Sequence, residues 1–209
     1  SIRQYQKAVE SLDDYNRTVE MGLQIVLKER MGATMQRKDA AIKRLGAIVF
    51  GSDQGLCGQL NEQISVFALD AMKEAGVKKE NRKVLAVGAR VADYVEDAGQ
   101  PVEELMATPS STAGITPLVQ EIIMIIEEWH FRQNVDHFML FYNDYISGSN
   151  YQPYKVQLLP VNHDWLKDLA RKKWDSKSLP IFRMDCNKIF SSLIREYLFV
   201  SLYRAFAES

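Results

Sequence analysis

The sequence predicts an α/β protein: a mixed sheet of about five strands with flanking helices, together with an antiparallel pair of long terminal helices. Short runs of β-forming residues alternate with helical patterns between residues 45 and 161. A glycine-rich turn joins the first strand of that region to its first helix. Amphipathic or strongly apolar segments of helical character stand at both ends of the chain.

The N-terminal segment, residues 1–30, has the seven-residue repeat of a coiled-coil helix. Two rows of positions spaced seven apart are apolar except for Asn16, a polar residue of the kind that can fix register. The apolar positions of this seam are Ile2, Tyr5, Val9, Leu12, Val19, Leu23 and Val26. Charged residues from 28 to 44 end the repeat.

The C-terminal segment, residues 185–209, predicts a second long helix that is apolar nearly all round. More than one neighbour must therefore cover it, and its seam positions are Leu193, Tyr197 and Val200. We expect the two terminal helices to pair antiparallel and to leave the sheet domain on the same side. Neither chain end carries a capping signal, which predicts a fragment that lacks the outer ends of both helices.

The sheet domain is predicted to span residues 45–161, with residues 162–184 as a surface loop. The expected strands are Leu45–Phe50, Val84–Val87, Val102–Met106, Val135–Tyr142 and Tyr151–Leu159. The expected helices run from the glycine turn to Ala75, over Arg90–Ala98, and onward from a cap at Thr116–Pro117. A short link, Tyr145–Asn150, makes the last strand antiparallel to its predecessor.

Composition excludes several classes of protein. The 26 basic and 27 acidic residues balance, so no overall field favours nucleic acid or anionic lipid. Two distant cysteines, Cys57 and Cys186, suit a reducing compartment better than a disulfide scaffold. The longest apolar run, Ile122–Ile126, is too short to cross a bilayer. Any work at a membrane would therefore go through a partner.

The stretch Ala47–Asn61, AIVFGSDQGLCGQLN, is the most informative part of the sequence. Ser52 and Asp53 are good N-caps for the helix that follows. Glycines at 51, 55 and 58 match neither dinucleotide nor P-loop spacing, and no lysine is present to reach a phosphate. A structural turn is therefore favoured over a nucleotide site. Cys57 is likewise read as a small buried residue rather than as a nucleophile, because no histidine lies within the motif.

Other residues suited to chemistry favour structural interpretations. His130, His137 and His163 have no cysteine or carboxylate cluster at a metal-ligand spacing, so surface or capping roles are expected and no metal or cofactor is predicted. The pair Glu127–Glu128 is expected to face solvent. The basic run Arg171–Lys173, flanked by Trp165 and Trp174, leaves a protein-contact patch open beside a plain surface interpretation.

With these features together, the chain resembles the γ subunit of an F-type ATP synthase. The family has S-D-R-G-L-C-G-x-x-N at this strand-to-helix turn, and seven positions here match it: Ser52, Asp53, Gly55, Leu56, Cys57, Gly58 and Asn61. The layout of helix, α/β domain and helix agrees, as do the ending Leu202–Ser209 and the sequence Leu158–Pro160. Gln54 stands where the family has arginine, which fits a divergent branch.

The resemblance implies a Rossmann-like sheet domain and a non-catalytic, peripheral central-stalk subunit in the F1 sector of a rotary motor. Its implied partners are the catalytic α and β subunits, the ε subunit and the c-ring at the cytoplasmic face of a membrane, without nucleic acid. Proton or sodium flow would drive ATP synthesis through its rotation. The alternatives are a small α/β enzyme that uses the Gly51–Gly58 turn or Cys57, and a structural adaptor whose coiled coil serves another assembly.

Overall fold

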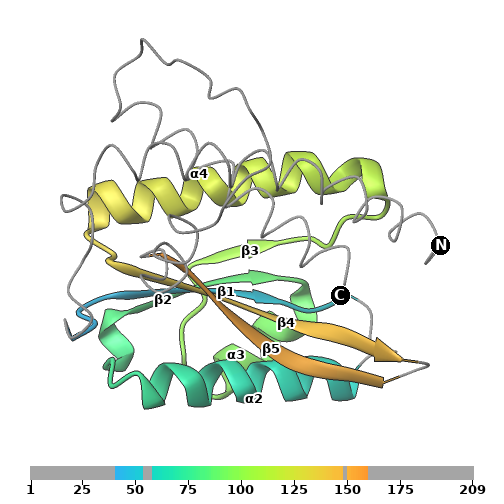
Figure 1. Cartoon of the computed structure of the whole chain (residues 1–209), viewed down its shortest axis with the longest axis horizontal. Helices are drawn as coiled ribbons and strands as arrows, with labels where there is room; N and C mark the ends of the chain where they lie inside the picture. Colours follow the sequence, from blue (N-terminus) through green and yellow to red (C-terminus); the bar gives the residue numbers. More distant parts are fainter. Residues whose placement is uncertain (1–40, 54–57, 148–149, 160–209) are drawn as a thin grey trace, which may run out of the picture.

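The computed structural model describes residues 41–53, 58–147 and 150–159, which form a five-stranded sheet covered by helices on both faces (Figure 1). The strands are β1 (Leu45–Phe50), β2 (Arg82–Val87), β3 (Glu104–Met106), β4 (His137–Ser147) and β5 (Asn150–Leu159). The helices are α2 (Gly58–Glu74), α3 (Ala89–Asp97) and α4 (Ile115–Gln133), with short 3₁₀ turns at Lys79–Asn81 and Thr112–Gly114. The predicted mixed sheet of about five strands is confirmed.

Strand β1 lies at the centre of the sheet, whose order is β3-β2-β1-β4-β5. It pairs in parallel with β2 on one side and with β4 on the other, and all six of its residues are buried. A strand covered on both faces needs a continuous apolar run instead of alternation, and LGAIVF is such a run. Strand β5 is antiparallel to β4, as its short connection predicted.

Two apolar cores lie on opposite faces of the sheet. Helix α4 covers one face and packs Ile122, Ile126 and Trp129 against side chains of β1, β2 and β4. Helices α2 and α3 cover the other face, as Figure 1 shows below the sheet, with Ile64 and Val91 in its core. Successive strand residues point to opposite faces, so one strand supplies both cores. Burial on both faces fixes the register of the central strands.

The sequence located every described strand and α-helix but neither 3₁₀ turn, and the other differences concern boundaries. Strand β1 has the predicted bounds, and Gly76 follows the end of α2 with a φ of +72°. Helix α4 begins at Ile115, with Gly114 at its N-cap and no side-chain capping bond, so the predicted cap at Thr116 is wrong. Strand β4 begins two residues later than predicted and extends to Ser147, which shortens the predicted Tyr145–Asn150 turn.

The chain enters and leaves the sheet at the same end. Leu45, which opens β1, pairs with His137, and Leu159, which closes β5, pairs with Phe138. The segments that precede residue 41 and follow residue 159 therefore both join the domain beside the start of β4. The predicted terminal helices, their seam residues and the 162–184 loop lie outside the described residues.

Candidate functional site

The turn after β1 is held by reciprocal hydrogen bonds between Ser52 and Asn61. The Ser52 N–H donates to Asn61 Oδ1 at 2.9 Å, and Asn61 Nδ2 donates to Ser52 Oγ at 2.9 Å. Asn61 is 1% exposed, so both ends of its amide are bonded inside the protein. Two of the predicted motif residues are thereby brought together, and they attach the end of β1 to the first turns of α2.

Asp53 lies where three segments meet at the carboxyl ends of the parallel strands. Its Oδ1 accepts the N–H of Ala89, the first residue of α3, at 2.9 Å. Its Oδ2 accepts the N–H of Thr108 at 2.8 Å and the Thr108 hydroxyl at 2.6 Å. One carboxylate therefore ties the turn after β1 to the start of α3 and to the loop after β3.

This geometry corrects the prediction that Ser52 and Asp53 cap the helix directly after them. Helix α2 begins at Gly58, and the carboxylate of Asp53 instead meets the N-terminus of α3. The N-cap of α3 is Gly88, which provides no side-chain cap. A negative charge suits this place because the first N–H groups of a helix lack partners within the helix. Asp53, from a distant segment, supplies the side-chain hydrogen-bond acceptor that Gly88 lacks.

Glycine at 51 and 88 allows the segments of the turn to approach closely. Gly88 has a φ of +109°, and a Cβ there would stand 2.8 Å from the backbone N and O of Ser52. At Gly51, a Cβ would stand 2.6 Å from Asn61 Oδ1 and 2.6 Å from Val91 Cβ. The backbone N–H of Gly51 bonds to Val87 O at 2.8 Å, and that of Gly88 to Met106 O at 2.8 Å. These bonds join the ends of β1, β2 and β3.

The electrostatics of the turn favour an ionised Asp53. Partial burial opposes ionisation, but the Thr108 hydroxyl and the N–H groups of Ala89 and Thr108 outweigh it and lower the pKa of Asp53. The N-terminus of α3 is therefore already neutralised by the chain's own carboxylate. A bound phosphate would have to displace it, which agrees with a structural turn. The remaining motif positions Gly55, Leu56 and Cys57 lie outside the described residues.

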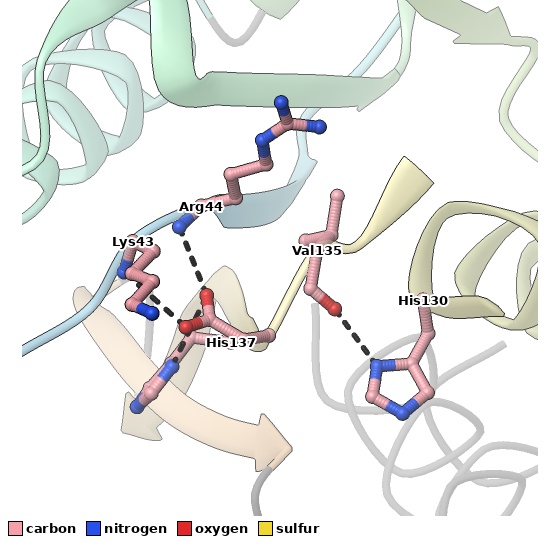
Figure 2. A network of polar contacts seen from close by, with 6 residues as sticks. Lys43, Arg44, His130, Val135 and His137 are labelled. Atoms are coloured by element: carbon pink, nitrogen blue, oxygen red, sulfur yellow. Dashed lines mark hydrogen bonds and ion pairs between the residues drawn. The ribbon is translucent and has the colours of Figure 1, made fainter. Parts of the chain in front are cut away.

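A second polar cluster lies at the opposite end of the sheet, where the chain enters β1 (Figure 2). The carboxylate of Asp136 accepts the N–H of Arg44 at 2.9 Å and that of Lys43 at 3.2 Å. The N–H groups of Asp136 and His137 in turn donate to Arg44 O, both at 3.2 Å. The guanidinium of Arg44 donates to Gln133 O, at the end of α4, at 2.6 Å.

Asp136 is held ionised in the same way as Asp53. Burial raises its pKa, but the N–H groups of Arg44 and Lys43 and the nearby His137 outweigh that effect, and the pKa of Asp136 falls below its ordinary value. The Nδ1 of His137 lies 3.5 Å from Asp136 Oδ1. This cluster, which we call the Asp136 joint, consists of Lys43, Arg44, Gln133, Asp136 and His137.

The histidines of the described segments have structural neighbours. His130 Nδ1 lies 2.8 Å from the carbonyl oxygen of Val135 and donates to it, which ties the end of α4 to the following loop (Figure 2). The sequence predicted a surface or capping role for His130, and the structure shows an exposed residue that bonds a carbonyl just beyond the end of α4. Within the described ranges, no three His, Cys, Asp or Glu residues gather closely enough to hold a metal ion. His163 and the patch around Arg171–Lys173 lie outside those ranges.

Comparison with known proteins decides the family. A family model described as ATP synthase matches residues 1–209. A relative from Pasteurella multocida, named ATP synthase gamma chain, is 26% identical over 214 residues, covering 100% of this chain and 71% of that protein. A gamma chain from Nitrosomonas eutropha is 25% identical over 178 residues, covering 81% of this chain and 58% of that protein. The chain belongs to the ATP synthase gamma-chain family.

Solved structures of ATP synthase share the fold. A chain from the central stalk and c-ring of the Tetrahymena thermophila mitochondrial enzyme aligns with a TM-score of 0.62 at 15% identity, covering 100% of this chain and 92% of that one. A rotor chain of the Euglena gracilis mitochondrial enzyme aligns with a TM-score of 0.56 at 13% identity, covering 99% and 84%. In the described part of this gamma-family chain, every helix falls short of what a bilayer span requires.

Sequence reasoning missed Gly88 and Thr108 at one end of the sheet and the Asp136 joint at the other. Gly88 and Thr108 follow β2 and β3 closely, and the carboxyl ends of parallel strands meet at one edge of a sheet. That rule could have placed them beside Asp53. Asp136 carried no comparable signal, because a single aspartate before a strand is an ordinary loop residue. The motif of the gamma-chain family contains residues from the carboxyl end of the sheet and none from the Asp136 joint at the amino end.

Proposed function

We propose that this chain is the central-stalk rotor subunit of an F-type ATP synthase. Ion flow through the c-ring would turn it, and its rotation would drive the catalytic subunits through different conformations. Catalysis belongs to those subunits, and this chain supplies torque and coupling. The observation that carries the proposal is the family match over all 209 residues, shared with relatives named ATP synthase gamma chain. The chain spans 71% of the first of these relatives and 58% of the second.

The direction in which the chain leaves the sheet supports this role. A rotor whose shaft is a pair of helices needs both helices to emerge from the same end of its globular part. The start of β1 and the end of β5 both lie against the first residues of β4. The heptad seam of residues 2–26 and the apolar segment 185–209 would then continue side by side as a coiled coil.

The construction of the sheet domain also suits the transmission of torque. Segments with few buried contacts open locally at low free energy. Under an applied torque such a segment would unfold and would not transmit the torque. Here the central strand is buried on both faces, and each end of the sheet is tied by an ionised aspartate. Asp136 and Arg44 hold the point at which the N-terminal segment enters the domain.

The proposed partners are the α and β subunits around the shaft, with the ε subunit and the c-ring at the globular part. The proposed location is the cytoplasmic face of a membrane, as a peripheral subunit attached through these partners and without contact with nucleic acid. Solved structures of similar fold come from assemblies described as central stalk with c-ring and as OSCP, F1 and c-ring.

The rival function, a small enzyme or nucleotide-binding domain at the Gly51–Gly58 turn, has less support. Its anion would need the free N–H groups at a helix start. At α3, the neighbouring helix start, the N–H of Ala89 is bonded to Asp53, whose negative charge would repel a phosphate near this turn. The start of α2 itself adjoins residues 54–57, which lie outside the described residues.

The decisive experiment supplies the protein that carries this chain to an ATP synthase complex that lacks its gamma subunit. Ion-driven ATP synthesis should return, and the protein should co-purify with the α, β and ε subunits. Assembly without synthesis would reject the coupling role, and failure to assemble would reject the rotor. Isothermal titration with ATP and ADP provides the opposing test, because micromolar binding by the isolated protein would favour the enzyme.

A further inference from the structure

The backbone bends at Arg44, one residue before β1 begins. Strand pairing of β1 starts at Leu45, which lies opposite Arg82 of β2 and His137 of β4. Residues 41–44 precede this pairing, so the strand ladder alone does not determine their direction. Contacts at the bend decide how the chain that precedes β1 leaves the domain.

One residue, Asp136, holds the peptide groups on both sides of this bend. Its Oδ2 accepts the N–H of Lys43 at 3.2 Å, and its Oδ1 accepts the N–H of Arg44 at 2.9 Å. Figure 2 shows Lys43 and Arg44 next to each other, with dashed lines that run to the same carboxylate. The N–H of Asp136 donates in turn to Arg44 O at 3.2 Å. Successive peptide groups of the entering segment are therefore bonded to a single residue.

The bend needs an acceptor with two oxygens, because each N–H bonds to a different one. An ionised carboxylate accepts through both oxygens, whereas a side-chain amide has one acceptor oxygen and an NH₂ group that can only donate. Asparagine at position 136 would therefore leave one N–H of the pair without its acceptor and turn a donor toward it. A lowered pKa keeps the side chain of Asp136 in the ionised form that the bend requires.

Side chains on either side of the bend reach opposite layers of the domain. Ile42 packs against the core beneath α2 and α3. The guanidinium of Arg44 donates to Gln133 O at 2.6 Å, at the end of α4, which covers the other face of the sheet. Rotation of the chain about the bend would break one of these contacts or both. Residues 42–44 are thus held relative to both layers.

We propose that Asp136 is a positioning residue, which fixes the direction in which the chain preceding β1 leaves the sheet domain. It pins the bend at Arg44 with both carboxylate oxygens and with its own N–H. An aspartate that only stabilised the fold would add to the free energy of unfolding, and its replacement would leave this direction unchanged. All contacts that support the positioning role lie between described residues, and the role does not depend on the rotor function.

Residual dipolar couplings in the NMR spectrum of the full 209-residue chain test the proposal, because they report the orientation of each N–H bond relative to the domain. In the unaltered chain, the couplings of residues 42–44 should fit the same alignment as those of β1 and β4. In Asp136→Asn they should fall to about half or less, since a freed peptide group averages over several orientations on a fast timescale. The couplings within Leu45–Phe50 should stay unchanged.

The matched control is Asp53→Asn, at the opposite end of the sheet. Asp53 also has a lowered pKa and accepts backbone N–H groups through both oxygens, from Ala89 and Thr108. Its replacement removes the same kind of interaction from a place that does not touch the bend. The couplings of residues 42–44 should therefore keep their values in this variant.

Three results would overturn the proposal. The couplings of residues 42–44 could persist in Asp136→Asn, which would show that the carboxylate does not hold the bend. They could fall together with those of β1, which would show a general loosening of the sheet. They could fall equally in Asp53→Asn, which would show a loss of stability and not of position.

A rotor whose shaft swivels at its attachment would lose part of each rotation, a consequence that rests on the proposed function. In a complex where the unaltered protein restores ATP-driven ion pumping, Asp136→Asn should lower the number of ions moved per ATP hydrolysed. Asp93→Asn, an exposed change on α3, should leave that number unchanged. An undiminished number with Asp136→Asn would reject the link between the bend and coupling. Failure of the unaltered protein to restore pumping would reject the rotor function and leave the NMR result standing.

Discussion

The two ends of the sheet use the same chemistry in different surroundings. At the carboxyl end, Asp53 accepts N–H groups from α3 and from the loop after β3. At the amino end, Asp136 accepts N–H groups from the segment that enters β1. Each carboxylate has a lowered pKa because these donors outweigh the cost of partial burial. Each joins segments that are distant in the sequence.

The surroundings differ in how closely backbones approach. The carboxyl end brings Gly88 against the backbone of Ser52 and Gly51 against Asn61, so glycine is required at two positions. The Asp136 joint is built on one carboxylate, and the glycine near it, Gly46, faces the Phe138 ring, 2.6 Å from an added Cβ, and not another backbone. Close approach leaves a recognisable motif in the sequence, whereas a single hydrogen-bonding side chain does not. We therefore expect the carboxyl end to be the less tolerant of substitution.

The largest effect is expected for Gly88→Ala. The new Cβ would meet the backbone of Ser52 at 2.8 Å, and alanine is strained at a φ of +109°. Strain and displacement together should lower the free energy of unfolding by about 3 kcal/mol. Urea unfolding followed by circular dichroism measures it. Gly76→Ala is the control, since its φ is +72° but nothing lies within 4 Å of the added Cβ, and it should cost only about 1 kcal/mol. Equal losses in both variants would mean that the close approach is unimportant.

The next effect is expected for Asn61→Leu, which removes the amide that bonds Ser52 while keeping a similar volume. The N–H of Ser52 would lose its bond to Oδ1 in a partly buried position. An unsatisfied group of this kind costs about 2 kcal/mol in the free energy of unfolding. Gln63→Leu, at an exposed position of the same helix, should change stability by less than about 0.5 kcal/mol. A loss below that value for Asn61→Leu would show that the reciprocal bonds are dispensable.

A smaller and pH-dependent effect is expected for Asp136→Asn and Asp53→Asn. A carboxyl group whose pKa is lower in the folded state stabilises the protein above its unfolded pKa of about 3.9, and this contribution disappears as the pH falls through the folded pKa. Each variant should therefore be less stable than the unaltered chain at pH 7, by at most about 1 kcal/mol and by less at the exposed Asp53 because solvent screens its charge, and the difference should shrink as the pH falls through the folded pKa.

Urea unfolding across that pH range measures this dependence, with Asp93→Asn on the surface of α3 as the control. Asp93 lies 3.8 Å from Arg90 in an exposed pair that should contribute little. A loss that is equal at pH 7 and pH 2 would contradict the ionised hydrogen bonds at both ends of the sheet.

The smallest effect is expected for Arg44→Met, which keeps the backbone bonds of the Asp136 joint and removes the guanidinium bond to Gln133 O. An exposed hydrogen bond of this kind contributes about 0.5–1 kcal/mol. Arg132→Met, at an exposed position near the end of α4, is the matched control and should have no measurable effect. Thermal unfolding of the two variants side by side decides whether the side chain of Arg44 adds to the joint.

Much of the fold could be predicted because its signals are local. The six residues of β1, the helical apolar face of α2 and Gly76 at its end are patterns within one segment. The antiparallel pairing of β5 followed from a short connection. The family motif was equally visible, since glycines and polar caps cluster within Gly51–Asn61. For residues 1–40 and 160–209 the heptad seam stays a prediction.

The roles of individual side chains could not be predicted in the same way. Asp53 is a residue type that often caps the helix directly after it. Its carboxylate instead accepts hydrogen bonds from Ala89 and Thr108, which lie 36 and 55 positions later in the sequence. The partners of Asp136 lie 92 and 93 positions earlier. Local propensity depends on neighbours along the chain, so the sequence alone determined strands, helices and family. The choice of partner for each carboxylate depended on which strand ends the parallel sheet brings together, and only the tertiary structure decided it.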